Sequence, residues 1–417
     1  MPTSNAAAIC FALFVFAGYY KAADPLQFIP IDLTLLFAAG TAAFCGFEIW
    51  RTRSLGPGIV PMLAIFLTLA IGLRWPEHFD SYATQKELRL FSITALSAFA
   101  PLILLRTDTR RLTFGYTVCL LGLVMAGLAV FEAARHGLSL RATIFNANPI
   151  LLARASGFAG LVLCLLYWQG RFNAWVIAPA ALISLIGLLA SGTKAPLLGL
   201  LVTVIAIAPF ALVNGANRKR IWGTLTVGCV GLAGALAYLA WAGVSVARRI
   251  AGPLTGEWGF AGETRLALWW QTLELIPLHP FGIGWGRFNE WIQLFENRTL
   301  MRHPHNIALE IFVEGGWLAG ATFLALAVVL VRRSTHALYK APATIGSAAS
   351  ADLLLVSAGL VYWLVCAAFS GDVNDNRPLW ALLGVTLAAL GSRRISKSDG
   401  LEGTVEVGDR REPLTGA

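Results

Sequence analysis

The sequence predicts an all-α, polytopic membrane protein with about twelve transmembrane helices and one large periplasmic helical loop. The first observation is composition: of 417 residues, 57% are hydrophobic and only 13% are charged, whereas a soluble globular domain has about 25% charged residues. The second is that the apolar residues occur in blocks long enough to cross a bilayer. Because lipid offers the backbone no hydrogen-bond partners, each of these blocks must form a helix.

The apolar blocks have the length of about 20 residues that a membrane span requires. They lie near 5–22, 31–50, 58–74, 88–105, 112–133, 150–168, 172–190, 195–213, 220–241, 306–331, 351–370 and 378–392. The predicted integral membrane domain covers 1–395, and a polar, disordered cytoplasmic tail is predicted at 396–417. The six cysteines lie inside the apolar blocks without metal-ligand spacing and are interpreted as buried small residues.

The basic residues set the orientation. In a soluble protein, the formal net charge of +9 would suggest a nucleic-acid partner. Here the basic residues cluster on alternate loops, which is the positive-inside pattern of a protein whose partners are membrane lipids and not nucleic acid. The predicted cytoplasmic clusters are Arg51 and Arg53; Arg106, Arg110 and Arg111; Arg171; Arg218, Lys219 and Arg220; Arg332, Arg333 and Lys340; and Arg393, Arg394 and Lys397. Both termini are therefore predicted to be cytoplasmic.

One long loop, about 242–305, then falls on the periplasmic side. Apolar residues recur at helical spacing in Glu263–Ile276 and again in Gly286–Asn297, which predicts two amphipathic helices. Thr264 is predicted to cap the first of them. That cap would place Arg265 at a helix N-terminus, where backbone amides and a guanidinium together suit an anion.

The sharpest local feature is Arg302-His-Pro-His-Asn306, just before the tenth predicted span. A histidine titrates near neutral pH and can take a proton from a hydroxyl. Glu310, one helical turn on, could approach His305 or an arginine. The same residues also fit a polar helix cap at the membrane interface. A metal site is less favoured, because no carboxylate or cysteine completes a ligand set with His303 and His305.

Two short polar segments fall on the same side as this motif. The first ends in Lys194, which breaks the positive-inside pattern; a snorkelling anchor is the favoured interpretation and a phosphate binder the alternative. The second, Ser370–Arg377, contains Asp372 and Asp375, which could pair with Arg377 or line a shared cavity. Basic and proton-accepting groups gathered at one face suit a substrate with an anionic head and a lipid tail.

Together these motifs resemble those of the O-antigen ligase and polymerase superfamily. Arg302–Asn306 followed by Glu314–Gly320 resembles the HxHN…ExGxxG signature of that superfamily. Arg265, Trp269, Pro277 and Pro280–Gly286 resemble its periplasmic R…W…P…P-GxGxG stretch.

Two further segments extend the resemblance, which covers about half the chain, from Asn146 to Trp380. Ser191–Lys194 is similar to the S-R-x-x-x-L segment of the family, with Lys194 where the family usually has arginine. Lysine keeps the charge but lacks the bidentate fork. Ser370–Asp372 with Asn376 and Arg377 is similar to the last outer loop of the family.

The resemblance implies a metal-independent membrane glycosyltransferase that uses no cofactor, at the periplasmic face of the bacterial inner membrane. The donor would be a glycan carried on undecaprenyl diphosphate. The acceptor would be lipid A-core in a ligase or the growing glycan in a polymerase. His305 would be the catalytic base, and the substrate-binding residues would be Arg265, Lys194, Arg302, His303, Asn306, Glu314 and Arg377.

Three functions stay open at this level: an O-antigen ligase, an O-antigen or exopolysaccharide polymerase, and a secondary transporter. The local motifs do not separate the first two, because both use the same donor. A transporter places its site near the bilayer midplane, often between inverted repeats. The chain has no recognisable repeat and its notable charges lie at helix ends, which weighs against the transporter.

Overall fold

The computed structural model describes residues 3–21, 26, 28–74, 81–136, 148–213, 216–241, 259–292, 302–340 and 348–402. In these ranges every regular element is a helix, which confirms the predicted all-α class. The α-helices are α1 (Thr3–Tyr20), α2 (Leu33–Thr52), α3 (Ile59–Leu69), α4 (Tyr82–Arg89), α5 (Ala95–Leu104), α6 (Asp108–His136), α7 (Pro149–Trp168), α8 (Ala174–Ala190), α9 (Lys194–Val213), α10 (Arg218–Trp241), α12 (Gly259–Leu275), α13 (Phe288–Trp291), α14 (Ile307–Gly315), α15 (Trp317–Lys340), α16 (Ala348–Phe369) and α17 (Arg377–Glu402).

Several of these helices are long and apolar enough to cross a membrane. Among the described residues there are seven, judged by length and composition: Leu33–Thr52, Tyr82–Leu104, Asp108–Glu132, Pro149–Trp168, Lys194–Val213, Trp317–Lys340 and Ala348–Phe369. Three shorter apolar helices are Asn5–Tyr20, Ile59–Gly72 and Ala174–Ala190. The chain is therefore a multi-pass membrane protein by these criteria, whereas the count of about twelve spans is not confirmed.

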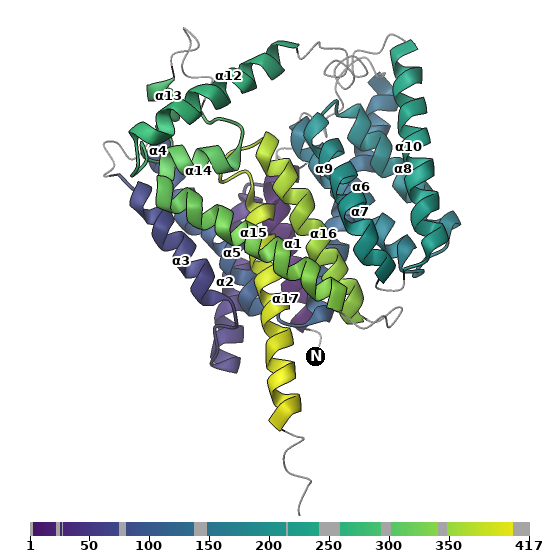
Figure 1. Cartoon of the computed structure of the whole chain (residues 1–417), viewed down its shortest axis with the longest axis horizontal. Helices are drawn as coiled ribbons and strands as arrows, with labels where there is room; N and C mark the ends of the chain where they lie inside the picture. The colour runs from purple at the N-terminus through teal and green to yellow at the C-terminus, as the bar shows by residue number, and fades with distance from the viewer. Residues whose placement is uncertain are drawn as a thin grey trace, which may run out of the picture.

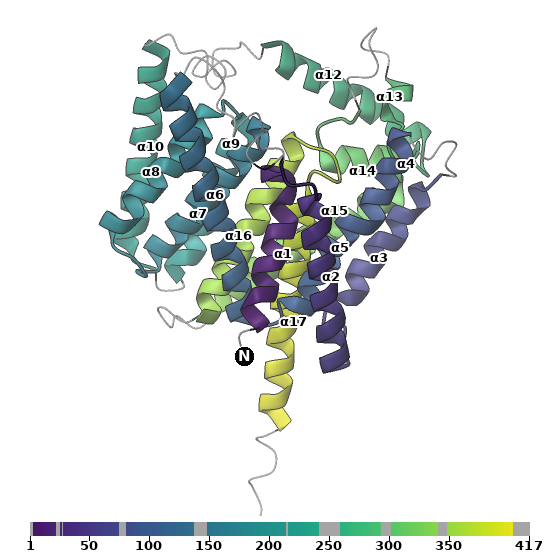
Figure 2. The ribbon, with the colours of Figure 1, turned by 180° about the vertical axis from the view of Figure 1, so that it is seen from behind.

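The core lies around α16 and α17, which pack against each other and against α9 and α5, respectively. Tyr362, Trp363 and Trp380 are among its largest buried side chains. The outward faces of peripheral helices expose large apolar residues such as Trp50 and Trp175, as expected of surfaces that meet lipid. Helices α12 and α13 lie across one end of the bundle, and the chain starts at the opposite end (Figures 1 and 2). We call these the α12 end and the N-terminal end.

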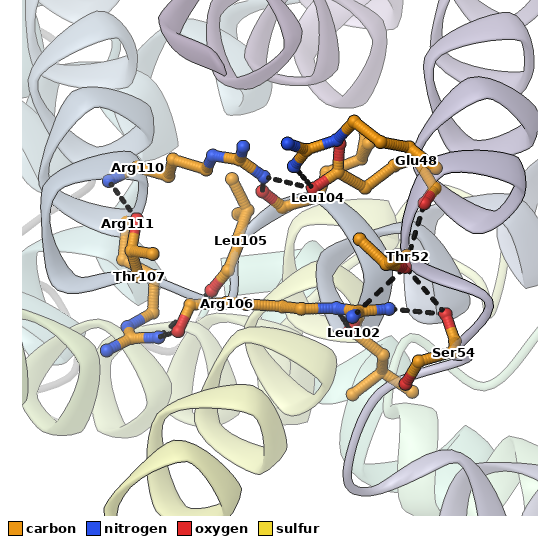
Figure 3. A network of polar contacts seen from close by, with 11 residues as sticks. Glu48, Thr52, Ser54, Leu102, Leu104, Leu105, Arg106, Thr107, Arg110 and Arg111 are labelled. Atoms are coloured by element: carbon orange, nitrogen blue, oxygen red, sulfur yellow. Dashed lines mark hydrogen bonds and ion pairs between the residues drawn. The ribbon is translucent and has the colours of Figure 1, made fainter. Parts of the chain in front are cut away.

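Basic residues at the N-terminal end are held in a network that joins α2, α5 and α6 (Figure 3). Arg110 lies 3.1 Å from Glu48, which also pairs with Arg51 at 2.7 Å. Arg106 donates to the carbonyl oxygen of Ser54 at 2.6 Å. Arg111 is fully buried and pairs with Asp352 of α16 at 2.8 Å. These clusters are the ones from which the sequence predicted the orientation.

The predicted tenth span, 306–331, is divided in the structure. Helix α14 ends at Gly315, and Gly316 adopts φ 89° and ψ 174° before α15 begins. A left-handed φ of this size suits glycine, which has no Cβ to clash. The predicted span therefore consists of a short helix at the α12 end followed by the candidate span Trp317–Lys340.

Of the two helices predicted in the long loop, the structure has the first nearly in full and the second only in part. The first, Glu263–Ile276, corresponds to α12. The second, Gly286–Asn297, is reduced to the single turn of α13, and 293–300 lie outside the described residues. Helix α17 continues to Glu402, into the segment predicted as a tail, and 403–417 lie outside the described residues.

Candidate functional site

Helix α12 brings Arg265 to the histidine segment. Arg265 and Trp269 are four residues apart and so share one face of the helix. The indole N–H of Trp269 donates to the carbonyl oxygen of Pro304 at 2.9 Å. Along the helix axis, Arg265 is therefore about 6 Å from Trp269, which contacts the segment that carries His305. Consistently, burial and then the charge of Arg265 lower the pKa of His305 to about 4.

The position of Arg265 within α12 corrects one sequence prediction. The helix begins at Gly259, so Thr264 lies inside it and the predicted N-cap is wrong. The free amides of a helix N-terminus are consequently not at Arg265, and an anion there would meet the guanidinium alone. Within the described ranges no carboxylate lies at ion-pair distance from Arg265. Burial lowers the pKa of its guanidinium, and the neighbouring charge of Arg154 lowers it further.

His305 has an unusual backbone. Its φ is +58°, in the left-handed region, where histidine is among the few non-glycine residues found repeatedly. This conformation turns the chain sharply between Pro304 and α14. The ring centroids of His303 and His305 lie 4.3 Å apart at 67°. Burial and then the neighbour His305 lower the pKa of His303 to about 3. Both rings are therefore neutral at pH 7, and a neutral imidazole can accept a proton.

The residues on either side of the histidines have different surroundings. Asn306 caps α14: its side-chain oxygen accepts from the backbone N–H groups of Ala308 and Leu309 at 3.0 and 3.2 Å. The capping interpretation of this part of the motif is thus correct for Asn306. Arg302 is exposed, and its guanidinium lies 4.7 Å from the ring centroid of Tyr82 on α4.

Glu314 belongs to a buried ionic cluster at the base of the site. The ammonium of Lys86 lies 2.6 Å from Glu310 and 2.6 Å from Glu314, and all three side chains are fully buried. Glu314 also accepts from the backbone N–H of Gly286 at 3.0 Å, and Glu310 from that of Val373 at 3.2 Å. The cluster joins α4, α14, the glycine-rich loop and the 370–376 segment. It therefore fixes the helix that the histidine motif precedes.

Sequence reasoning missed Lys86. Lys86 lies just before the predicted span 88–105, on the predicted periplasmic side. A lysine on that side breaks the positive-inside pattern. The same departure from the pattern singled out Lys194 in the sequence. The partners of Lys86 are 224 and 228 positions away in the sequence, since 310 − 86 is 224 and 314 − 86 is 228. A single sequence does not show pairing over that range.

The glycine-rich loop Pro280–Gly286 packs against the end of α14. The N–H of Ile283 donates to the carbonyl oxygen of Val313 at 2.8 Å, and the N–H of Trp317 donates to that of Pro280 at 2.9 Å. Gly282 has φ +78°, and a Cβ there would collide with the carbonyl oxygen of Glu314. The GxGxG and ExGxxG stretches seen in the sequence are therefore one packing unit.

The remaining candidates lie around this centre. Lys194 is the exposed first residue of α9 and is close enough to Arg265 for their charges to repel. Asp372 accepts from the N–H groups of Asn374 and Asp375 at 2.9 and 2.7 Å. The charge of Asp372 opposes the pKa decreases of both histidines.

Among the predicted site residues, Arg377 lies against α1. It begins α17 and contacts Gly18 of α1. The groups that act electrostatically on it include Tyr19, Asp375 and Arg89. Within the described ranges, no three His, Cys, Asp or Glu side chains are grouped so that they could hold a metal ion.

Comparison with known proteins gives one finding about this region. Residues 179–324 match the family model described as O-Antigen ligase. The matched range contains Lys194, Arg265, both histidines and Glu314. No match is found among the curated proteins.

Proposed function

We propose that this chain, a member of the O-antigen ligase superfamily by its residues 179–324, transfers a glycan from undecaprenyl diphosphate to lipid A-core. The reaction would take place at the periplasmic face of the bacterial inner membrane. The observation that carries the proposal is the proximity of Arg265 to half-buried His305: the face of α12 that carries Arg265 contacts the histidine segment through Trp269, and the charge of Arg265 helps to lower the pKa of His305. The imidazole of His305 can accept the proton of a hydroxyl nucleophile, and the guanidinium of Arg265 can bind a diphosphate leaving group.

The chemistry follows from these two groups. An acceptor hydroxyl gives its proton to His305 as its oxygen bonds to the anomeric carbon of the donor. The bond from that carbon to the diphosphate oxygen breaks, and the electron pair leaves with undecaprenyl diphosphate. Arg265 stabilises the charge that develops on the leaving group. Direct displacement inverts the anomeric configuration. The donor is already activated, so the step needs no nucleotide.

The other residues divide into contacts and supports. We assign to substrate binding Lys194, whose charge is near that of Arg265, His303, whose ring lies beside His305, and exposed Arg302. Asn306 and Glu314 serve substrate binding by positioning: the first caps α14, and the second ties α14 to the glycine-rich loop. We assign Arg377 to the more distant part of the substrate, because its contacts lie on α1.

A transfer assay with purified protein, lipid-linked glycan and lipid A-core tests the proposal. His305→Ala is expected to abolish transfer, since a positioned base contributes about 10²–10⁴-fold. His305→Asn is the companion variant, because asparagine tolerates a left-handed φ and has no basic ring. The matched control is His279→Ala. His279 lies in the same loop and contacts Trp291 with ring centroids 4.4 Å apart. Full transfer by a folded His305→Asn protein would remove His305 as the base.

The acceptor separates the ligase from the polymerase of the same superfamily. Cells that lack a ligase accumulate long polymer that is not attached to the core. Cells that lack a polymerase carry single repeats on the core. The lipopolysaccharide pattern of a deletion strain therefore decides between them, and we expect the first pattern.

A further inference from the structure

Three basic side chains are buried in the described part of the chain: Lys86, Arg111 and Arg154. Lys86 pairs with two glutamates at 2.6 Å. Arg111 pairs with Asp352 at 2.8 Å and also with Asp108. Arg154 forms no ion pair with any described carboxylate, although its exposed fraction is 0%. A buried charge without a counter-ion is costly, so its presence requires an explanation.

The contacts of Arg154 leave half of its guanidinium unused. Its Nη2 donates to the carbonyl oxygens of Ser370 and Cys366 at 2.5 and 3.1 Å. Its Nε and Nη1 have no hydrogen-bond partner among the described atoms. The hydroxyl of Tyr19 lies beside the guanidinium and interacts with it electrostatically, but the two groups do not meet in hydrogen-bond geometry. The neutral carbonyls hold Arg154 in place, and among the described carboxylates Asp375 acts on its charge only from beyond ion-pair distance.

The location of Arg154 connects it to the site. It follows the start of α7 by five residues, about 8 Å along the helix axis. The carbonyl it binds begins the 370–376 segment, whose Asp372 acts on both histidines. The charge of Arg154 is near enough to repel that of Arg265. The charge of Arg265 in turn repels that of Lys194. Three cations without a described carboxylate partner thus follow one another at the α12 end.

We propose that Arg154 is a further positioning residue of the donor site, whose fixed, buried positive charge attracts the diphosphate of the lipid-linked donor together with Arg265 and Lys194. The inference rests on the proposed function. Its mechanism is electrostatic: in a medium of low dielectric, a charge acts on an anion without contacting it. A ligand with two phosphates gains more from this charge than a ligand with one.

Binding of bare undecaprenyl diphosphate and of undecaprenyl monophosphate to purified full-length protein tests the inference without requiring transfer. Arg154→Met is expected to weaken binding of the diphosphate by about ten-fold and that of the monophosphate less. Arg154→Lys, which keeps the charge, is expected to stay within about three-fold of the wild type. Inorganic pyrophosphate is the third ligand, and it shows whether the headgroup alone is sufficient.

Thermal stability provides the control against a purely structural role. Arg154→Met removes a buried charge that has no ion pair among the described residues, so its melting temperature without ligand is expected to equal or exceed that of the wild type. Arg111→Lys is the matched control, because Arg111 is also a buried arginine but is ion-paired. We expect this variant to have a lower melting temperature and an unchanged affinity for the diphosphate lipid. If Arg154→Met unfolds the protein as a damaged core would, or weakens both lipids equally, Arg154 is structural and the inference is overturned.

The outcomes also separate this inference from the proposed function. If the wild type binds the diphosphate lipid and Arg154→Met binds it equally well, Arg154 has no role in donor binding, while the proposed donor stands. If the wild type binds undecaprenyl diphosphate no better than the monophosphate, both the donor assignment and the role of Arg154 are refuted.

Discussion

The two ends of the bundle use the same residue types in opposite ways. At the N-terminal end, Arg51 and Arg110 share Glu48, and Arg110 and Glu48 belong to the network of Figure 3. Arg111 pairs with Asp352 and donates to the carbonyl oxygens of Leu105 and Arg106. At the α12 end, Lys194, Arg265 and Arg154 have no described carboxylate within ion-pair distance. The number of charges is therefore not what distinguishes the site. Its distinguishing feature is that these three charges form no ion pair within the described part of the protein.

The proposed orientation and function account for this difference. Basic residues at the cytoplasmic end of a membrane protein set its topology, and pairing them stabilises the folded chain without any ligand. A site for an anionic headgroup must keep its cations available, and the folded protein bears the electrostatic cost. Lys86 shows that the α12 end can also pair a buried cation, because it is held by two glutamates.

The largest expected effect is on stability at the paired end. Arg111→Met leaves Asp352 buried and unpaired, and we expect it to destabilise the protein by about 3–5 kcal/mol. Adding Asp352→Leu is expected to recover much of that loss, since both charges are then gone. Unfolding of the single and double variants, followed in detergent or nanodiscs, measures the difference. A double variant no more stable than Arg111→Met would show that charge pairing is not what Arg111 contributes.

The next effect is on catalysis at the unpaired end. Arg265→Met is expected to reduce transfer about 100-fold or more, as removal of one group that stabilises a leaving oxygen does in other enzymes. Arg265→Lys is expected to recover part of the rate, because the charge returns without the fork. Arg110→Lys, at the paired end, is the matched control and should transfer normally. Equal rates in the Arg265 and Arg110 variants would argue against a diphosphate clamp at Arg265.

A smaller effect is expected in the loop that supports the site. Gly282→Ala introduces a Cβ at a positive φ against the carbonyl oxygen of Glu314, and should cost about 1–3 kcal/mol. Transfer should fall with it, since the loop holds α14. Gly127→Ala is the control, because a Cβ on Gly127 of α6 meets open space. If the two variants are equally stable and equally active, the loop does not position α14 in the way described.

Much of this arrangement could be predicted from the sequence, because it is local. The apolar blocks gave the all-α membrane class, and the spacing in Glu263–Ile276 predicted α12. What could not be predicted depends on contacts between distant positions. The partners of Lys86 are in α14. Arg154 is the only charged residue in the apolar block 150–168, which marks it as unusual in a span, but its contacts with Cys366 and Ser370 could not be predicted from the sequence. The division at Gly316 also depends on a distant segment, the glycine-rich loop that packs against it.

The acid limb of the pH profile tests most directly whether Arg265 and His305 share one site. The base must be neutral to act, so kcat/KM of the wild type should fall only as the pH drops through about 4, the pKa to which burial and Arg265 lower His305. Arg265→Met removes a positive charge that disfavours the protonated ring, so this limb should move to higher pH, toward the ordinary histidine pKa of about 6.5. Arg110→Met should leave the limb where it is. A limb that stays in the same place in Arg265→Met, in a protein that still transfers glycan measurably, would show that the two side chains do not act on each other and would contradict the account.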